Sequence, residues 1–246
     1  MSIDPKHKHK NYSKWFLTKV KHAVIDFGML DDGDKVAVGI SGGKDSMALL
    51  YILLLLKKWS NFKFELYPIT VDPGFGMDYT PIKEFCDKEN LTYTIVPTQI
   101  GEIVFDVRME SNPCSLCAKL RRGALHDAAL ELGCKKVALG HHADDLIETF
   151  FLNLCYTGRF STFKAKTFLD RTGLWQIRPL VYLHEETLAS LAKLGKLPIV
   201  KNLCPASGIT KREDMKEMVA FLEERCPEIK ERFLTALRRK DNIDLW

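Results

Sequence analysis

A short glycine-containing turn lies between a predicted strand and a long apolar helix, and this arrangement strongly limits how the chain can fold. The strand covers residues 35–40, the turn reads Ser41-Gly42-Gly43-Lys44-Asp45-Ser46, and the helix covers residues 47–58. Free N–H groups and the dipole at a helix N-terminus favour an anion, and glycine lets the backbone approach it closely. The turn is therefore predicted to bind phosphate, helped by two serine hydroxyls and the charge of Lys44.

Asp45 distinguishes this turn from the Walker loop. The Walker pattern has four residues between its glycines and Ser or Thr after the lysine, whereas here three residues separate Gly39 from Gly43 and Asp45 follows the lysine. A carboxylate beside phosphate needs a divalent cation between them, and Mg²⁺ is the expected ion. The turn resembles the SGGxDS loop of the PP-loop ATP pyrophosphatases. That resemblance implies that the protein binds ATP and cleaves it between the α- and β-phosphates, leaving AMP on a substrate oxygen.

Strand and helix signals continue to alternate after the turn. Further strands are predicted at 62–71, 91–96 and 136–139, and further helices at 81–90, 116–132 and 144–155. Such alternation is typical of βαβ units. We therefore expect an α/β fold with an open, mostly parallel sheet and helices on both faces, as in the PP-loop (adenine nucleotide alpha hydrolase-like) proteins. Residues 163–169 and 174–177 flank a turn-forming run and predict a β-hairpin.

The chain is expected to divide into three regions. Residues 1–30 form a basic tail and a helix at 11–30, residues 31–180 form the ATP-binding catalytic domain, and residues 181–246 form a helical extension that carries Cys204. The helices of the extension are predicted at 185–194, 211–224 and 228–239. A length of 246 residues, 46% of them hydrophobic, suits one α/β domain with a modest appendage.

The sequence shows no signal for export or for membrane insertion. Its longest apolar run, residues 47–56, is too short to cross a bilayer, and residues 1–21 lack the pattern of a signal peptide. We therefore expect a cytoplasmic protein that makes no membrane contact. In that compartment the seven cysteines are not expected to form disulfides.

Polar residues follow two of the predicted strands, at the edge where ligands lie in open parallel sheets. Asp72 follows the strand at 62–71, and it either helps to hold the nucleotide or its metal or caps its own loop. Gly140-His141-His142-Ala143-Asp144-Asp145 follows the strand at 136–139. Asp144 is either the N-cap of the next helix or a functional carboxylate that holds Mg²⁺ or accepts a proton from a substrate amine.

Cys114 and Cys117 form a C-x-x-C pair at the start of a predicted helix. Thiols at a helix N-terminus have a lowered pKa, which favours metal binding or sulfur chemistry, so structural zinc, a dithiol redox pair and an iron–sulfur cluster all stay open. Zinc sites and clusters ordinarily use four protein ligands. The chain has no second C-x-x-C, and Cys204 is the candidate for a further ligand. The other cysteines are predicted to be small buried hydrophobic residues: Cys86, Cys134, Cys155 and Cys226.

Four sequence blocks resemble the TtcA family, the tRNA 2-thiocytidine synthetases, and the similarity extends over residues 15–240. The blocks are residues 114–123, 138–145, 177–180 and 202–204. The resemblance implies a 4Fe-4S cluster held by Cys114, Cys117 and Cys204, with one iron open to carry a sulfide. It also implies that ATP adenylates the C2 oxygen of the cytidine at position 32 in the tRNA anticodon loop, and that sulfur then displaces AMP.

The predicted site residues fall into three groups, of which the three cysteines are the metal ligands. Those expected to take part in catalysis are Lys44, Asp45, Arg121 and Asp144. Those expected to bind ATP are Ser41, Gly42, Gly43, Lys44, Asp45, Ser46, Asp72, Gly140, His141 and Asp145. The resemblance also implies tRNA and a sulfur donor such as a cysteine desulfurase as partners, and a homodimer is one arrangement open to such an enzyme.

Basic and aromatic residues supply candidate contacts to RNA. The net charge is +4, and basic side chains could contact phosphates, although for any single one a solvated surface position is the simpler interpretation. These candidates are Lys119, Arg121, Arg122, Lys135, Lys136, Arg159, Lys164, Lys166, Arg171, Arg238, Arg239 and Lys240. Tyr156 and Phe160 are candidates for stacking on an unpaired base, whereas Phe150 and Phe151 are expected to pack in the core.

Four other functions fit parts of this pattern. A tRNA 2-thiouridine synthetase or a thio-nucleobase desulfurase would also use a cluster, and a PP-loop ligase would work without one. A redox-sensing nucleotide-binding module would bind ATP without releasing pyrophosphate. The known 2-thiouridine enzymes of this type carry paired-cysteine zinc sites near both termini, and this chain has no such pairs there. Formation of 2-thiocytidine in tRNA separates the leading hypothesis from all four.

Overall fold

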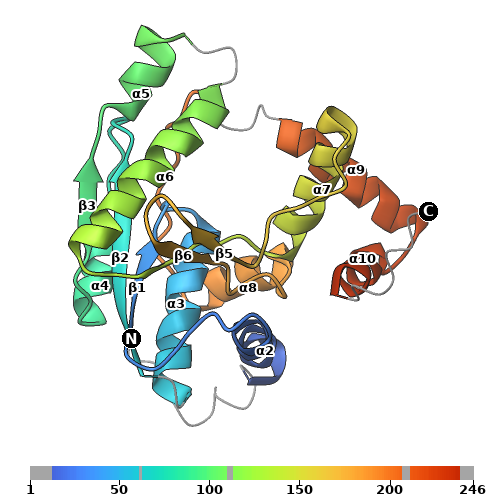
Figure 1. Ribbon diagram of the computed structural model, residues 1–246, viewed down its shortest axis with the longest axis horizontal. Helices are drawn as coiled ribbons and strands as arrows, with labels where there is room; N and C mark the ends of the chain where they lie inside the picture. The colour runs from blue at the N-terminus through green and yellow to red at the C-terminus, as the bar shows by residue number, and fades with distance from the viewer. Residues whose placement is uncertain (1–12, 61–62, 110–112, 207–210, 239–246) are drawn as a thin grey trace.

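Six strands form one sheet in the order β3-β2-β1-β4-β6-β5 (Figure 1). The computed structural model describes residues 13–60, 63–109, 113–206 and 211–238. Neighbouring strands are parallel except β5 and β6, which form an antiparallel hairpin. The strands are β1 Asp34–Gly39, β2 Phe64–Asp72, β3 Thr94–Pro97, β4 Lys136–Ala138, β5 Lys166–Leu169 and β6 Leu174–Ile177. The structure therefore confirms the predicted open, mostly parallel sheet and the predicted hairpin.

The expected helices are present in the described part of the chain, with some ends shifted. They are η1 Ser13–Leu17, α2 Thr18–Asp26, α3 Lys44–Trp59, α4 Thr80–Lys88, α5 Ile100–Glu102, η2 Ile103–Val107, α6 Pro113–Glu131, α7 Ala143–Thr157, α8 Glu185–Leu194, α9 Lys211–Arg225 and α10 Ile229–Arg238. The sequence analysis assigned no element to α5 and η2. Among the described residues, no helix has the length and apolar character needed to span a membrane.

Two helices begin three residues earlier than expected. α3 starts at Lys44 because Gly43, in an extended conformation, serves as its N-cap. α6 starts at Pro113, which suits the first position of a helix because its ring pre-sets φ and its missing N–H has no partner there. As a result, Lys44 lies in the first turn of α3, and Cys114 and Cys117 lie in the first two turns of α6.

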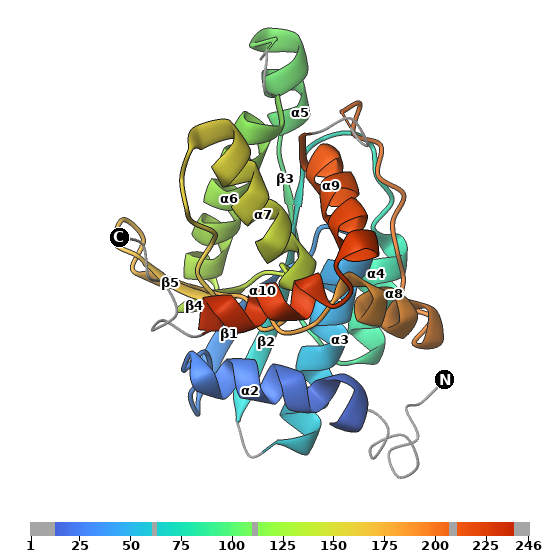
Figure 2. The same cartoon turned by 90° about the vertical axis from the view of Figure 1, so that its right-hand side faces the viewer.

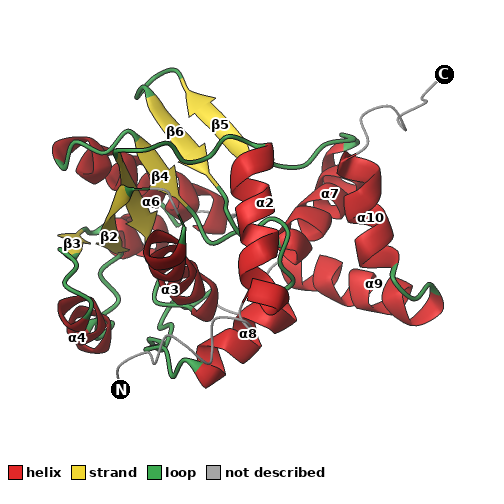
Figure 3. Cartoon of the chain, turned by 90° about the horizontal axis from the view of Figure 1, so that it is seen from below, coloured by secondary structure: helices red, strands yellow, loops and turns green. Residues whose placement is uncertain are grey.

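The two faces of the sheet bury separate cores, beneath the helices that flank the sheet in the view from below (Figure 3). Successive side chains of a strand point to opposite faces. Val36 and Val38 of β1 accordingly belong to a core with α2, α3, α4 and α8, whereas Ala37 belongs to a second core with η2 and α6. Helices therefore cover both faces, as predicted.

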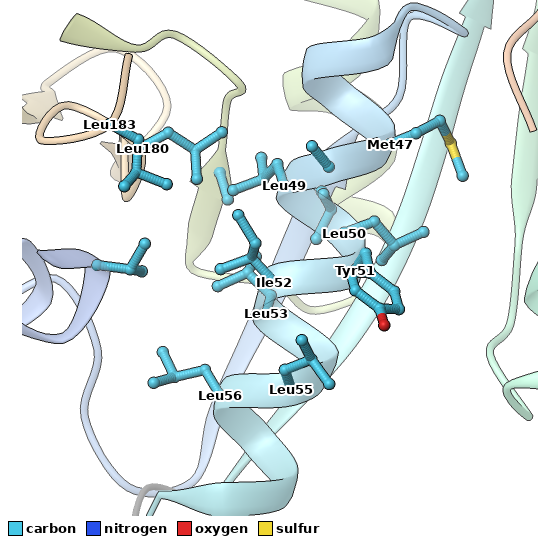
Figure 4. Close-up of a cluster of buried hydrophobic side chains, with 14 of the residues drawn as sticks. Met47, Leu49, Leu50, Tyr51, Ile52, Leu53, Leu55, Leu56, Leu180 and Leu183 are labelled. Carbon is cyan, nitrogen blue, oxygen red and sulfur yellow. The ribbon is translucent and has the colours of Figure 1, made fainter. Parts of the chain in front are cut away.

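The helix that follows the phosphate loop is buried on nearly every side (Figure 4). Met47, Leu49, Leu50, Ile52 and Leu53 are fully buried, because α3 lies against the sheet on one side and α8 on another. Burying a side chain of this size contributes roughly 1.5–3 kcal/mol. The loop is therefore attached to one of the most firmly held elements of the molecule.

The remaining helices lie beside the sheet. α7, α9 and α10 stand at the opposite end of the molecule from β3 (Figure 1), and α9 runs next to α7 (Figure 2). α9 and α10 both pack against α7. The predicted boundary near residue 180 stays a prediction, although α8, beyond it, packs against α3 in the main core.

Candidate active site

The site forms where the strand order changes direction. β1 pairs with β2 on one side and with β4 on the other, because the chain runs from β1 through β2 to β3 and then crosses back to add β4 on the opposite side of β1. Open α/β sheets bind ligands in the crevice that this arrangement leaves at the carboxyl ends of the strands. The phosphate loop follows β1 and residues 139–142 follow β4, so the two segments border this crevice.

The serines of the loop hold its shape. Ser41 Oγ donates a hydrogen bond to Ser46 Oγ (3.1 Å), which in turn donates to the carbonyl of Gly43 (2.9 Å). The backbone N–H of Ser41 also donates to Ser46 Oγ (3.1 Å). These bonds close the turn over the start of α3 and leave its shape set before any anion arrives.

Two glycines let other segments approach the loop. A Cβ on Gly140 would lie 3.1 Å from the carbonyl carbon of Asp45, so the chain after β4 rests directly on the first turn of α3. A Cβ on Gly42, where φ is 85°, would lie 3.1 Å from Cβ of Val200. Any side chain at either position would push the neighbouring segment away from the loop.

Lys44 is held by two carboxylates. Its Nζ lies 2.8 Å from Glu185 Oε1 and 3.1 Å from Asp45 Oδ2, and Glu185 also pairs with Lys216 at 2.8 Å. Burial opposes the charge of Lys44, but the two carboxylates outweigh it and raise the pKa of the lysine. Burial likewise opposes the charge of Glu185, whose pKa the two lysines nevertheless lower to about 2. Sequence reasoning missed Glu185, because nothing near it in the chain marks it as a loop contact.

Asp45 has one carboxylate oxygen without a partner. Its Oδ1 is buried and accepts no hydrogen bond from the described residues, and His142 Nε2 lies 3.9 Å from it. A buried, unsatisfied carboxylate oxygen is costly. Because the atom lies beside the phosphate loop, its environment fits a hard divalent cation such as Mg²⁺.

His142, and not Asp144, is the N-cap of α7. Its ring accepts a hydrogen bond from the N–H of Asp145 (3.4 Å), and Asp145 Oδ2 accepts one from the N–H of His142 (3.0 Å), which completes a capping box. The other oxygen of Asp145 accepts from Arg212 at 2.7 Å. The N-cap alternative for Asp144 is therefore wrong.

Asp144 joins three helices instead. Its carboxylate accepts a hydrogen bond from the N–H of Glu185 (2.8 Å), lies 3.2 Å from His184 Nδ1 and pairs with Lys230 at 3.1 Å. Burial would raise the pKa of Asp144, but these donors together hold it well below its usual value. Both oxygens are used within the fold, so the contacts assign a structural role, and the predicted catalytic role gains no support from them.

A cavity of about 290 Å³ lies at the carboxyl ends of β1, β2 and β4. Its lining residues are Gly39, Ile40, Ser41, Ile69, Val71, Ala118, Arg121, Arg122, Leu125, Leu139, His141, Gln176 and Arg178. Arg178 Nε donates to His141 Nδ1 (3.2 Å). Burial, with the charge of Arg178, lowers the pKa of His141 to about 4, which keeps the ring neutral. Apolar walls with cationic side chains at one end suit a nucleotide.

Asp72 lies outside the lining of this cavity. Its Oδ1 accepts hydrogen bonds from the N–H of Gly74 (3.0 Å) and from the hydroxyl of Tyr79 (3.4 Å). Of the two alternatives for Asp72, the contacts show the loop cap.

The three predicted ligand cysteines line a second cavity of about 280 Å³. The described residues around it are Ser41, Gly43, Pro73, Phe75, Met77, Phe105, Pro113, Cys114, Cys117, Ala118, Arg121, Val200, Asn202 and Cys204. All three thiols are free, with Cys114 exposed and the other two half-buried. We call this cavity the thiol pocket.

The surroundings of Cys117 differ from the helix-terminus expectation. Burial raises the pKa of Cys117; the Arg121 guanidinium opposes this, and the nearby Cys204 and Cys114 add to the rise. The predicted lowering of the pKa is therefore wrong for this thiol, because loss of solvent outweighs the opposing charge of Arg121. The same interactions place Cys117 within electrostatic reach of both other sulfurs.

The donor set of the thiol pocket suits a cluster better than a single ion. Apart from its three cysteines, the described lining contains no His, Asp or Glu. Within the described chain, no three His, Cys, Asp or Glu side chains, these three cysteines included, are arranged to hold a single metal ion. Structural zinc sites use four protein ligands, whereas three soft thiolates with an open side fit an iron–sulfur cluster that keeps one iron unligated by protein.

The two cavities adjoin. Ser41, Ala118 and Arg121 line both of them, so the start of α6 and the first residue of the loop form their common wall. Arg121 therefore faces the predicted nucleotide on one side and the thiols on the other.

The other cysteines separate into two kinds. Cys86 and Cys134 are buried, as predicted, but Cys155 and Cys226 are exposed, and the prediction is wrong for them. Cys155 lies near the end of α7, and Cys226 follows the last residue of α9. Their single positions within helical patterns suggested burial, but both helix ends are open to solvent.

The predicted RNA contacts are also sorted by the structure. Lys136 is buried and pairs with Asp31 (2.7 Å) and Asp34 (2.6 Å), so it is unsuited to bind phosphate. Phe150 is buried, whereas Tyr156 and Phe160 are 45% and 57% exposed. Lys211 lies over the Tyr156 ring at 4.3 Å, which places a cation and an exposed ring together. Residues 239 and 240 lie outside the described part of the chain.

The sheet order, the loop after β1 and the adjoining cavity define an α/β nucleotide-binding protein of the PP-loop class, and residues 13–217 match the family model of the PP-loop domain. The chain is 37% identical over 222 residues to the tRNA-cytidine(32) 2-sulfurtransferase of Geobacter sulfurreducens, which covers 89% of this chain and 86% of that protein. It belongs to the tRNA-cytidine(32) 2-sulfurtransferase family. The relative of that name from Pelobacter propionicus is 39% identical over 222 residues and covers 89% and 82%.

Solved structures show the same fold. The U34-tRNA thiolase NcsA from Methanococcus maripaludis with its 4Fe-4S cluster has a TM-score of 0.71 at 26% identity, covering 91% of this chain and 78% of that one. An NH3-dependent NAD synthetase from Campylobacter jejuni has a TM-score of 0.50 at 15% identity. These comparisons confirm the predicted family and fold.

Proposed function

We propose that this protein is an ATP-dependent tRNA sulfurtransferase that converts the cytidine at position 32 to 2-thiocytidine. The observation that carries the proposal is the common wall of the two cavities, formed by Ser41, Ala118 and Arg121. A site that primes a base with ATP and a site that supplies sulfur must act on the same carbon. Adjoining cavities meet that requirement, since one bound base can face both.

Cys114, Cys117 and Cys204 would hold a 4Fe-4S cluster with one iron open. When bound, the cluster supplies the sulfur that replaces the C2 oxygen. Arg121 opposes the rise that burial causes in the pKa of Cys117, and Asn202 Oδ1 accepts a 3.0 Å hydrogen bond from the backbone N–H of Cys204.

The adenylation step is assigned to the loop. The C2 oxygen of the base attacks the α-phosphate of ATP and pyrophosphate leaves, so the oxygen becomes part of an AMP ester. Lys44 and the backbone N–H groups at the start of α3 would stabilise the departing negative charge. Asp45 would hold Mg²⁺ through its unpartnered oxygen. When sulfide attacks C2, AMP departs with that oxygen and the product is C2=S, with no change in redox state.

tRNA and ATP are the substrates of this proposal, and a cysteine desulfurase is the proposed type of sulfur donor. We place the reaction in the cytoplasm. Tyr156, Phe160 and Lys211 form an exposed patch of rings and charge near the end of α7 that would suit unpaired RNA.

The test is anaerobic reconstitution of the protein with iron and sulfide, followed by incubation with ATP, Mg²⁺ and unmodified tRNA. Mass spectrometry of the nucleosides should show 2-thiocytidine. Cys114→Ala, Cys117→Ala and Cys204→Ala should each abolish it, whereas Cys155→Ala, an exposed thiol outside the pocket, should leave it unchanged.

Two results would decide against the proposal. Full activity of iron-free protein would favour a PP-loop ligase. Product in the form of 2-thiouridine, or release of sulfide from thiolated bases without ATP, would favour one of the other cluster enzymes.

A further inference from the structure

The segment that carries Cys204 is docked on the phosphate loop. Between α8 and Cys204 the chain passes over the loop, and the N–H of Val200 donates a hydrogen bond to the carbonyl of Gly42 (2.9 Å). The packing is close, since a Cβ on Gly42 would lie 3.1 Å from Cβ of Val200. Val200 also lines the thiol pocket with Cys204. One residue therefore contacts the loop and forms part of the wall around the third thiol.

Both helices that flank this segment are tied to the same region by charge. On the α8 side, Glu185 pairs with Lys44 at 2.8 Å. On the α9 side, Arg212 bonds to Asp145 at 2.7 Å. Bound phosphates would compete with Glu185 for Lys44. Occupation of the loop would therefore alter the contact at the start of α8, the helix that precedes the segment, as well as the contact at Val200.

We propose that Val200 is a positioning residue that couples the place of the Cys204 thiol to occupation of the phosphate loop. The inference rests on the proposed function for its purpose, which is to bring the third thiolate into place when the nucleotide is bound. Its physical content is narrower: an anion that fixes Gly42 also fixes Val200, and through it residues 201–204.

The experiment uses the full-length, reduced, cluster-free protein and a non-hydrolysable ATP analogue. The rate at which iodoacetamide alkylates Cys204 is followed by mass spectrometry of its peptide, with and without saturating analogue. In the parent protein the analogue should slow alkylation about fivefold or more, the lower end of ordinary coupling between sites. Ile199→Ala changes the adjacent, 53% exposed residue and should behave as the parent does.

Val200→Pro removes the N–H that donates to Gly42, so it should lose most of this protection although the analogue still saturates the loop. Val200→Ile and Val200→Ala, which both keep the N–H, should retain it. Equal protection in Val200→Pro would show that the nucleotide merely shields the thiol, and would overturn the inference. So would the absence of protection in the parent.

A second measurement decides the matter even if Val200→Pro fails to fold. Coupling between two sites acts in both directions, so cross-linking Cys204 to Cys114 or Cys117 with dibromobimane should tighten analogue binding. Unchanged affinity would contradict the coupling. These assays use neither cluster nor tRNA, so the coupling can be absent while 2-thiocytidine is still formed. If instead the coupling is present and no 2-thiocytidine forms, only the proposed function is contradicted.

Discussion

Buried charge is concentrated in the residues around the nucleotide site. Glu148 lies on α7, one turn after Asp144 and Asp145, with its Oε2 4.0 Å from Arg212. Burial and then the charge of Asp145 raise the pKa of Glu148 from 4.5 to about 7. A carboxyl group with a raised pKa binds a proton more readily in the folded state, so its contribution to stability is complete below about pH 4.5 and disappears as the pH rises towards 7.

Glu148→Gln should remove this pH dependence. Glutamine keeps the shape of the protonated side chain and cannot ionise, so the variant should be more stable than the parent at about pH 8, by up to roughly 3 kcal/mol, and similar to it at about pH 5. Urea unfolding at the two pH values measures the difference. The exposed Glu186→Gln is the matched control, and a parallel loss of stability in parent and Glu148→Gln would contradict the assignment.

At the scale of elements, local patterns predicted order and type well. The strands and most helices follow from alternation of apolar residues and from glycine and proline positions, because these signals are local. Contacts between distant elements were not predictable in the same way. Glu185 and Val200 lie more than 140 residues after the loop they touch, and their neighbours in the sequence carry no mark of that contact. The π-helical turn η2 was missed for another reason, since its short run lacks a repeated apolar face.

The candidate site was predictable to the extent that its residues form motifs. The loop 41–46 and the C-x-x-C pair are recognisable from their residues alone. Cys204 was a candidate for a further ligand from the sequence, and the family resemblance then assigned it to the cluster. The catalytic role of Asp144 stays a prediction, because a carboxylate at a strand end looks the same in sequence whether it faces a ligand or a neighbouring helix. Only packing shows that its oxygens are used by His184, Glu185 and Lys230.

Asp144→Asn should therefore act through stability. Losing the charge leaves Lys230 and His184 without their buried partner, which typically costs about 3 kcal/mol or more, and α7, α8 and α10 should loosen together. Urea unfolding of the cluster-free protein measures the effect, with the exposed Asp87→Asn on α4 as a control. Unchanged stability combined with lost turnover would instead restore the catalytic role.

At the scale of the whole molecule, basic and aromatic side chains on the surface are expected to make separate contributions to RNA binding, the first through phosphates and the second through stacking on bases. Phosphate contacts release counterions and make affinity depend on salt, whereas stacking does not. The exposed patch near the end of α7 offers both, because Phe160 presents a ring and Lys211 a charge beside Tyr156.

Phe160→Ala should weaken tRNA binding with little change in its salt dependence, by about 1–3 kcal/mol if the ring stacks on a base. Lys211→Gln should reduce the salt slope by about one. Fluorescence titration of labelled tRNA over a range of salt concentrations distinguishes the two. Phe168 is an exposed ring on the β5–β6 hairpin, so Phe168→Ala should bind tRNA as the parent does. Equal losses of affinity in Phe160→Ala and Phe168→Ala would contradict a specific role of the patch near α7.

The distribution of the thiols has a consequence for biogenesis. Two of them, Cys114 and Cys117, lie in the first two turns of one helix, α6. The third, Cys204, lies on the segment after α8 that contacts the phosphate loop. Two of the three proposed cluster ligands are therefore held on one helix, independently of the segment that carries Cys204. Iron and sulfide should therefore bind first to the two cysteines of α6 and be held firmly only when Cys204 also binds. A variant with a disrupted Cys204 segment should still take up metal but release it readily.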